Sequence, residues 1–154
     1  MSNNTLIKNT IMELASDKDH SIFYTSKRND SPMPDIAKLD QIVELLNKII
    51  FPGYFGESTI NPQNLQYYIG VYLDQLKNLL SEQIKRGICF DSANEKQSTN
   101  YVPIANEKTL SFIKRLPEIK RLLRTDIEAT FLGDPASKSQ GEIIYCYPGI
   151  RAIT

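Results

Sequence analysis

The amino-acid sequence predicts an all-α protein, a helical bundle of five to six helices. Apolar residues recur at intervals of three and four along most of the chain, which is the spacing of one helix face. Proline, glycine and the capping residues Asp, Asn and Ser stand where these segments begin and end, as is typical of helix boundaries. The sequence shows no convincing series of strands and no internal repeats. Helices with polar connections therefore form the expected architecture.

The first helix is expected at residues 4–16, because Ile7, Ile11 and Leu14 follow one another at helical spacing. A polar segment follows at residues 17–34. Its Ser-Pro and Met-Pro pairs disfavour helix just before each proline, so this segment is expected to form a loop. His20, which is the only histidine, lies here without a metal ligand at helical spacing, and we interpret it as a surface residue.

A second helix is expected after Asp35, whose carboxylate is a strong helix cap. The sequence FPGYFG at residues 51–56 ends this helix, because proline cannot continue the hydrogen-bond ladder and glycine tolerates unusual backbone angles. The expected apolar stripe is formed by Leu39, Ile42, Val43, Leu46, Ile49 and Ile50.

A third helix is expected to start at Asn61-Pro62, a capping residue followed by proline at the first helical position. Gly87 is well placed to end it. Its apolar face comprises Leu65, Tyr68, Ile69, Tyr72, Leu76, Leu79, Leu80 and either Gln83 or Ile84.

A solvated loop is expected at residues 88–105. We assign residues 1–87 to a helical bundle and residues 106–154 to a second set of helices, and the loop is a hinge if the two pack separately. A fourth helix starts near Asn106, and Pro117 either kinks it or starts a new one. Gly133 stands where a left-handed helix end is expected.

The last segment carries two further helix-start signals. Asp134-Pro135 pairs a carboxylate cap with proline at the first helical position, and Ser139 with Glu142 forms a capping box. A short apolar helix with Ile143, Ile144, Cys146 and Tyr147 follows, and Pro148-Gly149 ends it. Ile150 and Ile153 then begin another helix. From local chemistry alone, Asp134 is interpreted as a cap.

Composition narrows the possible functions. The 154 residues suit one domain, and 18 basic residues balance 18 acidic ones, so nucleic acid or an anionic membrane surface is not an expected partner. The sequence has neither an apolar run long enough for a bilayer nor a signal-peptide pattern at its start. Cys89 and Cys146 show no metal-ligand spacing and are expected to be reduced thiols, which favours a cytoplasmic location.

Common catalytic signatures are also missing. A Ser-His-Asp triad is not indicated, because nothing around the only histidine marks it as catalytic. The sequence also lacks a phosphate-binding glycine loop and a zinc-binding pattern. The tyrosines at positions 67, 68 and 72 are better explained by core or interface packing than by a stacking platform. A basic cluster could contact a phosphate-bearing cofactor or nucleic acid, but interleaved acidic residues favour a solvated helix face. The cluster comprises Lys114, Arg115, Lys120, Arg121 and Arg124.

Residues 107–154 carry three motifs in order. They are Asp126-Ile127-Glu128-Ala129, Asp134-Pro135-Ala136 and Gly149-Ile150-Arg151-Ala152-Ile153. This arrangement resembles the end of the N-terminal helical domain of bacterial serine O-acetyltransferases. The resemblance implies an enzyme that transfers acetyl from acetyl-CoA to the hydroxyl of L-serine, within cysteine biosynthesis. It also implies a hexamer in which two trimers pair, with the helical domain forming the contact between the trimers.

In that family the aspartate of the Asp-Pro-Ala motif contacts the amino-acid substrate, so the resemblance assigns substrate binding to Asp134. Pro135 and Asp126 are secondary candidates from the same motifs. Helix amides are expected to keep Asp134 ionised. Cysteine binds at the same site in feedback-sensitive members.

The family's catalytic histidines and acetyl-CoA site belong to a β-helix of hexapeptide repeats, which these 154 residues do not contain. The resemblance therefore implies no cofactor, metal or catalytic residue in this chain, and no activity of the chain alone. The apolar end of the sequence is expected to be a helix cut in its first turns. Two alternatives remain: a stand-alone helical interaction module without catalysis, and an unrelated helical regulator.

Overall fold

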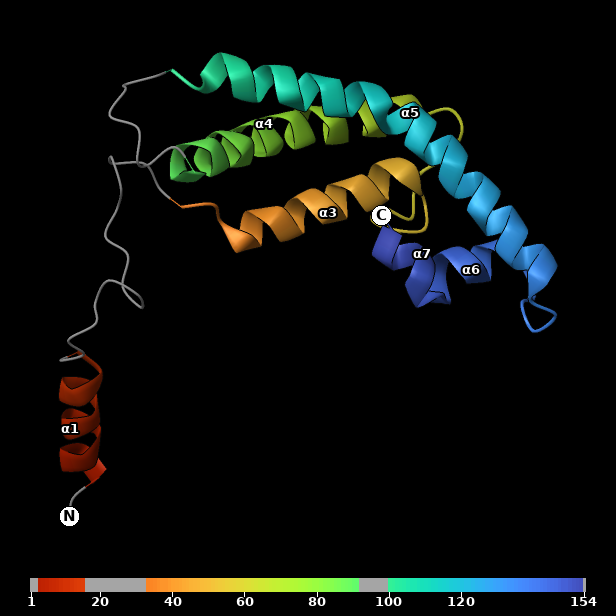
Figure 1. Ribbon diagram of the computed structural model, residues 1–154. Helices are drawn as coiled ribbons and strands as arrows, with labels where there is room; N and C mark the ends of the chain where they lie inside the picture. Colours follow the sequence, from red (N-terminus) through yellow and green to blue (C-terminus); the bar gives the residue numbers. More distant parts are fainter. Residues whose placement is uncertain (1–2, 16–32, 92–99, 154) are drawn as a thin grey trace. The chain divides into compact units, whose positions relative to one another are not determined.

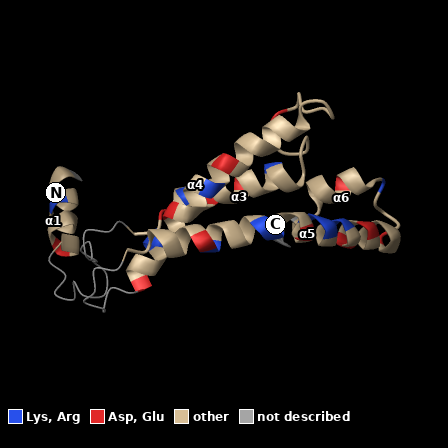
Figure 2. Ribbon diagram, turned by 90° about the horizontal axis from the view of Figure 1, so that it is seen from above, with Lys and Arg blue, Asp and Glu red and all other residues tan. Residues whose placement is uncertain are grey.

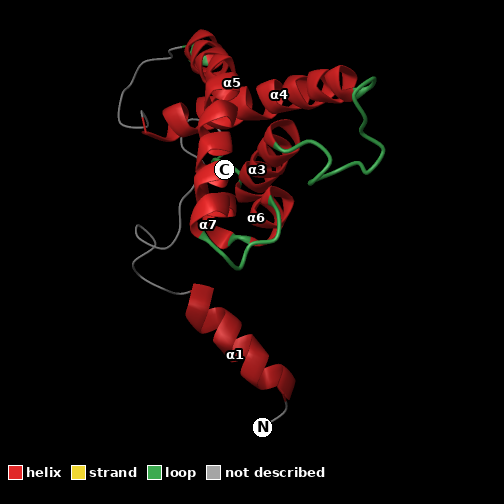
Figure 3. Cartoon of the chain, turned by 90° about the vertical axis from the view of Figure 1, so that its right-hand side faces the viewer, coloured by secondary structure: helices red, strands yellow, loops and turns green. Residues whose placement is uncertain are grey.

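A computed structural model describes residues 3–15, 33–91 and 100–153 (Figure 1). The chain divides into two units, Met1–Pro32 and Met33–Thr154, which are described separately below. Helices joined by loops make up all of the secondary structure that is described, apart from one isolated bridge between Pro52 and Phe55 (Figure 3). The prediction of an all-α fold with five to six helices is confirmed. The helices are α1 (Asn3–Ala15), α3 (Ile36–Ile50), α4 (Leu65–Asp91), α5 (Val102–Gly133), α6 (Gln140–Cys146) and α7 (Pro148–Ile153).

The first unit contributes helix α1, which matches the expected helix within one residue at each end. Its apolar residues Ile7, Ile11 and Leu14 are exposed rather than part of a core. Residues 16–32, which include His20 and most of the expected loop, lie outside the described part of the chain.

Helix α3 begins as expected at Asp35, whose Oδ1 accepts hydrogen bonds from the amides of Ala37 at 3.0 Å and Lys38 at 3.4 Å. Its buried face is narrower than expected. Leu39 and Val43 are exposed, whereas Leu45 is buried. Because only one side of α3 packs on the rest of the bundle, the buried residues follow one narrow stripe: Ile42, Leu45, Ile49 and Ile50.

The turn after α3 confirms the expected role of two glycines. Gly53 has a φ of 86° and Gly56 a φ of 96°, angles that other residues rarely adopt. Asn61 caps the next turn, since its Oδ1 accepts from the amide of Asn64 at 3.1 Å and its own amide donates to Asn64 Oδ1 at 2.8 Å. These bonds form a separate turn, so α4 starts at Leu65 rather than directly after Asn61.

Two expected helix boundaries around the loop at residues 88–105 are wrong. Helix α4 continues through Gly87 to Asp91, and α5 begins at Val102 rather than near Asn106. Gly87 does not adopt the positive φ that ends a helix, so nothing interrupts the ladder there. At the start of α5, Asn100 Oδ1 accepts from the amide of Val102 at 3.1 Å. The ends of the expected loop are therefore helical.

The second unit has one shared core, so residues before and after this loop do not pack separately. Leu76 of α4 and Ile143 of α6 are fully buried within it. The remaining buried residues come from all five helices of this unit and from the residue that follows α3: Ile42, Leu45, Ile49, Ile50, Phe51, Tyr72, Leu116, Leu123, Ile127, Ile144 and Ile150. Helices α3 and α4 pack together, α4 packs on α5, and α5 packs on α6. The core thus holds the last two short helices against the bundle.

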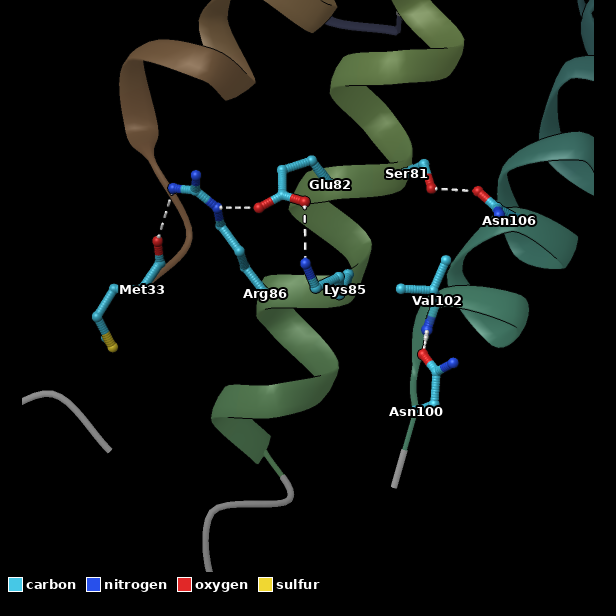
Figure 4. Close-up of polar contacts among 8 residues, drawn as sticks. All are labelled: Met33, Ser81, Glu82, Lys85, Arg86, Asn100, Val102 and Asn106. Carbon is cyan, nitrogen blue, oxygen red and sulfur yellow. Dashed lines mark hydrogen bonds and ion pairs between the residues drawn. The ribbon is translucent and has the colours of Figure 1, made fainter. Parts of the chain in front are cut away.

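Polar contacts tie α4 to both of its neighbours (Figure 4). The side chain of Arg86 contacts Glu82 at 3.0 Å and the carbonyl of Met33 at 3.4 Å. On the other side, Ser81 Oγ donates to Asn106 Oδ1 at 2.6 Å. Gln83, one of the two residues expected on this helix face, is buried, and its Oε1 accepts from the amide of Asp35 at 2.8 Å. The start of α3 is therefore fixed on α4.

Helix α5 is continuous, with Pro117 inside it. Figure 1 shows that α5 runs beside α4 and then changes direction toward α6. Proline removes a backbone donor from the ladder, which accounts for a bend rather than a break. Among the described helices, none combines the length and the apolar character that a membrane span requires.

Candidate functional site

Asp134 lies at the C-terminal end of α5, and its amide donates to the carbonyl of Thr130 at 3.0 Å. The expected left-handed conformation of Gly133 is wrong, because Gly133 is the last helical residue and lacks a positive φ. The expected helix start at Asp134-Pro135 is also wrong. The Asp134 carbonyl accepts from the amide of Ser137 at 3.1 Å and from its hydroxyl at 2.8 Å, which closes a turn instead of a helix.

Both carboxylate oxygens of Asp134 accept hydrogen bonds. Oδ1 accepts from the amide of Ala136 at 2.9 Å, within the turn. Oδ2 accepts from the hydroxyl of Tyr147 at 2.5 Å, across thirteen residues of sequence. These two donors fix the orientation of the carboxylate. Each oxygen keeps a second lone pair that a further donor can use.

The two hydrogen-bonded groups shift each other's pKa. The Tyr147 hydroxyl, followed by the Ala136 amide, lowers the pKa of Asp134 below its ordinary value of 3.8. The same bond to Asp134 raises the pKa of Tyr147 from 10.0 to about 12. At neutral pH the pair is therefore a carboxylate and a neutral phenol. The helix amides expected to stabilise the charge do not do so, because Asp134 lies at the negative end of the α5 dipole.

Helices α6 and α7 position Tyr147. Ser139 caps α6 as expected, and its Oγ accepts from the amide of Glu142 at 3.1 Å. Glu142 Oε2 accepts from the amide of Lys138 at 2.8 Å. The carboxylate therefore binds the amide of the residue before the cap rather than the amide of Ser139 itself. Tyr147 follows the last residue of α6, while the burial of Ile143 and Ile144 anchors that helix on the core.

The two secondary candidates take different positions. Pro135 is the exposed residue after Asp134, at the start of the turn. Asp126 is exposed on α5, where its carbonyl accepts from Thr130 Oγ1 at 2.8 Å. Eight residues of α-helix rise about 12 Å, so Asp126 and Asp134 lie at different levels of α5. The structure brings Tyr147, not Asp126, to the carboxylate of Asp134.

Tyr147 is the site residue that the sequence did not predict. It was assigned only to the apolar face of a short helix. Nothing in the local pattern specifies a bond to Asp134.

The other candidate groups show mixed outcomes. Arg124 Nε pairs with Glu128 at 3.0 Å, and Figure 2 shows basic and acidic residues together along α5. Tyr72 is buried in the core, as expected, whereas Tyr67 is exposed. Cys89 and Cys146 are free thiols. Within the described ranges, no group of three His, Cys, Asp or Glu residues lies close enough to hold a metal ion.

Comparisons with known proteins place this geometry in context. The chain matches no protein-family model. It is 42% identical over 127 residues to the plasmid serine acetyltransferase of Synechococcus elongatus, a match that covers 80% of this chain and 40% of that protein. The chain thus spans well under half the length of this curated relative.

One solved structure supports the fold. The native serine acetyltransferase 1 of Entamoeba histolytica aligns with a TM-score of 0.54 at 24% identity, covering 94% of this chain and 47% of that chain. The same enzyme in complex with L-cysteine aligns with a TM-score of 0.46 at 22% identity, covering 94% and 46%. The family resemblance seen in the sequence is confirmed: the chain is a relative of the serine acetyltransferases, and its described residues form an all-α domain.

Proposed function

We propose that this chain is the N-terminal helical part of a serine O-acetyltransferase and supplies one side of its serine site. The cyanobacterial relative supports the family, and the arrangement of Asp134 carries the proposal. An ionised carboxylate with a fixed orientation and unused lone pairs suits recognition of an ammonium group. Asp134 has these properties through its bonds to Tyr147 and Ala136.

In this proposal, Asp134 accepts a charge-assisted hydrogen bond from the ammonium group of L-serine. Holding the ammonium orients the substrate, so that its hydroxyl faces a general base in another part of the enzyme. L-cysteine, the product of the pathway, carries the same ammonium group and would bind the same carboxylate. Acetyl-CoA would be the co-substrate of the intact enzyme.

The helical bundle also serves assembly in this proposal. Exposed apolar residues of the second unit, such as Val43, Val71 and Leu110, are candidates for contacts between copies in a hexamer. Sedimentation at increasing protein concentration tests this role, with association as the expected result. A strict monomer at high concentration would argue against it. The free thiols Cys89 and Cys146 favour a cytoplasmic location for the enzyme.

The 154-residue chain alone is expected to be inactive, since Asp134 binds substrate and transfers no proton from the serine hydroxyl. The assay is release of the CoA thiol from acetyl-CoA in the presence of L-serine and the purified chain. No release above the background rate is the expected result. Measurable turnover would show that the chain holds a complete site.

The DNA that follows codon 154 separates this proposal from its main alternative. A reading frame that continues with hexapeptide periodicity is expected for an acetyltransferase. An immediate natural stop codon would instead favour a stand-alone helical interaction module, which keeps the fold and lacks catalysis. That module would also bind its partners without any requirement for Asp134.

A further inference from the structure

A cavity of about 400 Å³ opens between the C-terminal end of α3, the middle of α5 and the start of α6. Cavities of this size are in the range that small-molecule ligands occupy. The lining residues come from three segments: the end of α3 with the turn after it, residues 117–127 of α5, and α6. All of them belong to the second unit of the chain.

The lining has two chemically distinct parts. Its apolar part includes four core residues that are buried in the bundle: Ile50, Phe51, Ile127 and Ile144. Its charged part consists of Lys120, Arg121 and Arg124, which follow one another on a single face of α5. A ligand with an apolar body and a negatively charged group would complement both parts.

Two of the three cations have no ion-pair partner among the described residues, and the third is only partly used. Arg124 uses its Nε on Glu128, which leaves the terminal nitrogens of its guanidinium group available. Among the ion pairs of the described residues, none involves Lys120 or Arg121. Lys120 is an exposed residue, but partial desolvation of its ammonium group still lowers its pKa, and no counter-charge offsets that effect. An anion in the cavity would supply that counter-charge.

The remaining basic residues of the cluster act as an internal comparison. Lys114 and Arg115 stand six residues earlier on the same helix and do not line this cavity. If the basic cluster were only a solvated helix face, the pair Lys114 and Arg115 and the pair Lys120 and Arg121 would have similar surroundings. The position of Lys120 and Arg121 beside an apolar cavity separates them from Lys114 and Arg115.

We propose that this cavity binds a small molecule that carries one phosphate or carboxylate group on an apolar body. The anionic group contacts Lys120, Arg121 and the free guanidinium nitrogens of Arg124, which match planar and tetrahedral anions. The apolar body lies against Ile127 and Ile144. This site does not depend on the function proposed for Asp134.

The test uses 1-naphthyl phosphate as a probe, with binding to the 154-residue chain measured by titration calorimetry. Saturable binding of one probe per chain is expected. The double variant Lys120→Gln/Arg121→Gln should weaken binding about tenfold or more, because two charged donors are lost. The matched variant Lys114→Gln/Arg115→Gln removes the same charge from the same helix and should change affinity less than about twofold. Circular dichroism of each variant confirms that the helices remain.

Three results would overturn the proposal. The first is no saturable binding to the unmodified chain. The second is an equal loss of affinity in both double variants, which would show a general charge effect. The third is equally tight binding of inorganic phosphate, which would show that the apolar lining contributes nothing. Amide chemical-shift changes confined to the cavity segments of α3, α5 and α6 would support the assigned location.

Discussion

Replacing Asp134 with asparagine should lower the pKa of Tyr147 back toward its ordinary value, because Asp134 is the largest cause of the shift. The Tyr147 hydroxyl donates to Asp134 Oδ2 at 2.5 Å, and this bond to a carboxylate raises the tyrosine pKa from 10.0 to about 12. Asparagine has nearly the same shape, and its carbonyl oxygen can still accept from the Ala136 amide. The Asp134→Asn variant thus removes the charge and keeps an acceptor for the turn.

The expected difference is large at pH 11. With a pKa of about 12, roughly one-tenth of Tyr147 is ionised at that pH, whereas with an ordinary pKa roughly nine-tenths is ionised. Carbon NMR of labelled tyrosine follows each phenol between pH 8 and pH 11, and the Tyr147→Phe variant assigns the signal. Asp126→Asn, on the exposed face of α5, is the matched control and should leave Tyr147 unchanged. If Tyr147 titrates identically in the unmodified and Asp134→Asn proteins, the proposed bond does not control its charge.

The same bond gives stability a defined dependence on pH. Because the folded pKa of Tyr147 is raised, its contribution is complete below pH 10 and is lost as the pH rises toward 12. Because the folded pKa of Asp134 is lowered, its contribution is present above pH 3.8 and is lost as the pH falls through the folded value. The difference in urea midpoint between the unmodified and Tyr147→Phe proteins should therefore shrink at both extremes. A difference that stays constant across pH would contradict this assignment.

Three further predictions concern the bundle, each measured as the free energy of unfolding in urea. Leu76→Ala should cost about 2–5 kcal/mol because Leu76 is fully buried, whereas Leu132→Ala, at an exposed position, should cost less than about 0.5 kcal/mol. Equal costs would contradict the assigned core. Asp35→Ala should cost about 1 kcal/mol through loss of the α3 cap, and an unchanged stability would show that water replaces it. Gln83→Leu should cost about 1–3 kcal/mol because the Asp35 amide loses its acceptor, and a stabilised variant would refute that bond.

Short-range hydrogen bonds account for the parts of the fold that the sequence predicted well. Asp35 and Ser139 each cap a helix through an amide two or three residues away, so the local sequence contains the whole interaction. The expectations at Gly87 and Gly133 fail because they depend on long-range contacts: α4 continues past Gly87, and α5 ends at Gly133 without a left-handed residue. A glycine ends a helix only where the following chain leaves the helical path, and the contacts that decide this lie elsewhere in the fold.

The candidate site shows the same division. The sequence identifies Asp134 as a candidate because its motif consists of three consecutive residues, Asp134-Pro135-Ala136. Its partner Tyr147 was not, because their bond depends on the turn at Pro135 and on the burial of Ile143 and Ile144. Those features arise from packing, which a periodic pattern does not specify. The cavity beside Lys120 was missed for the same reason, since its walls come from three separate helices.

A chimera with the Synechococcus elongatus relative tests the central claim, that Asp134 forms one side of a serine site. The part of that protein that corresponds to this chain is replaced by the whole 154-residue chain, and kcat/KM for L-serine is measured with and without Asp134→Asn. The account predicts an active chimera in which Asp134→Asn lowers kcat/KM about tenfold to a hundredfold, as expected for loss of one charged contact, while Asp126→Asn has a smaller effect. An active chimera with the same kcat/KM for L-serine before and after Asp134→Asn would contradict it.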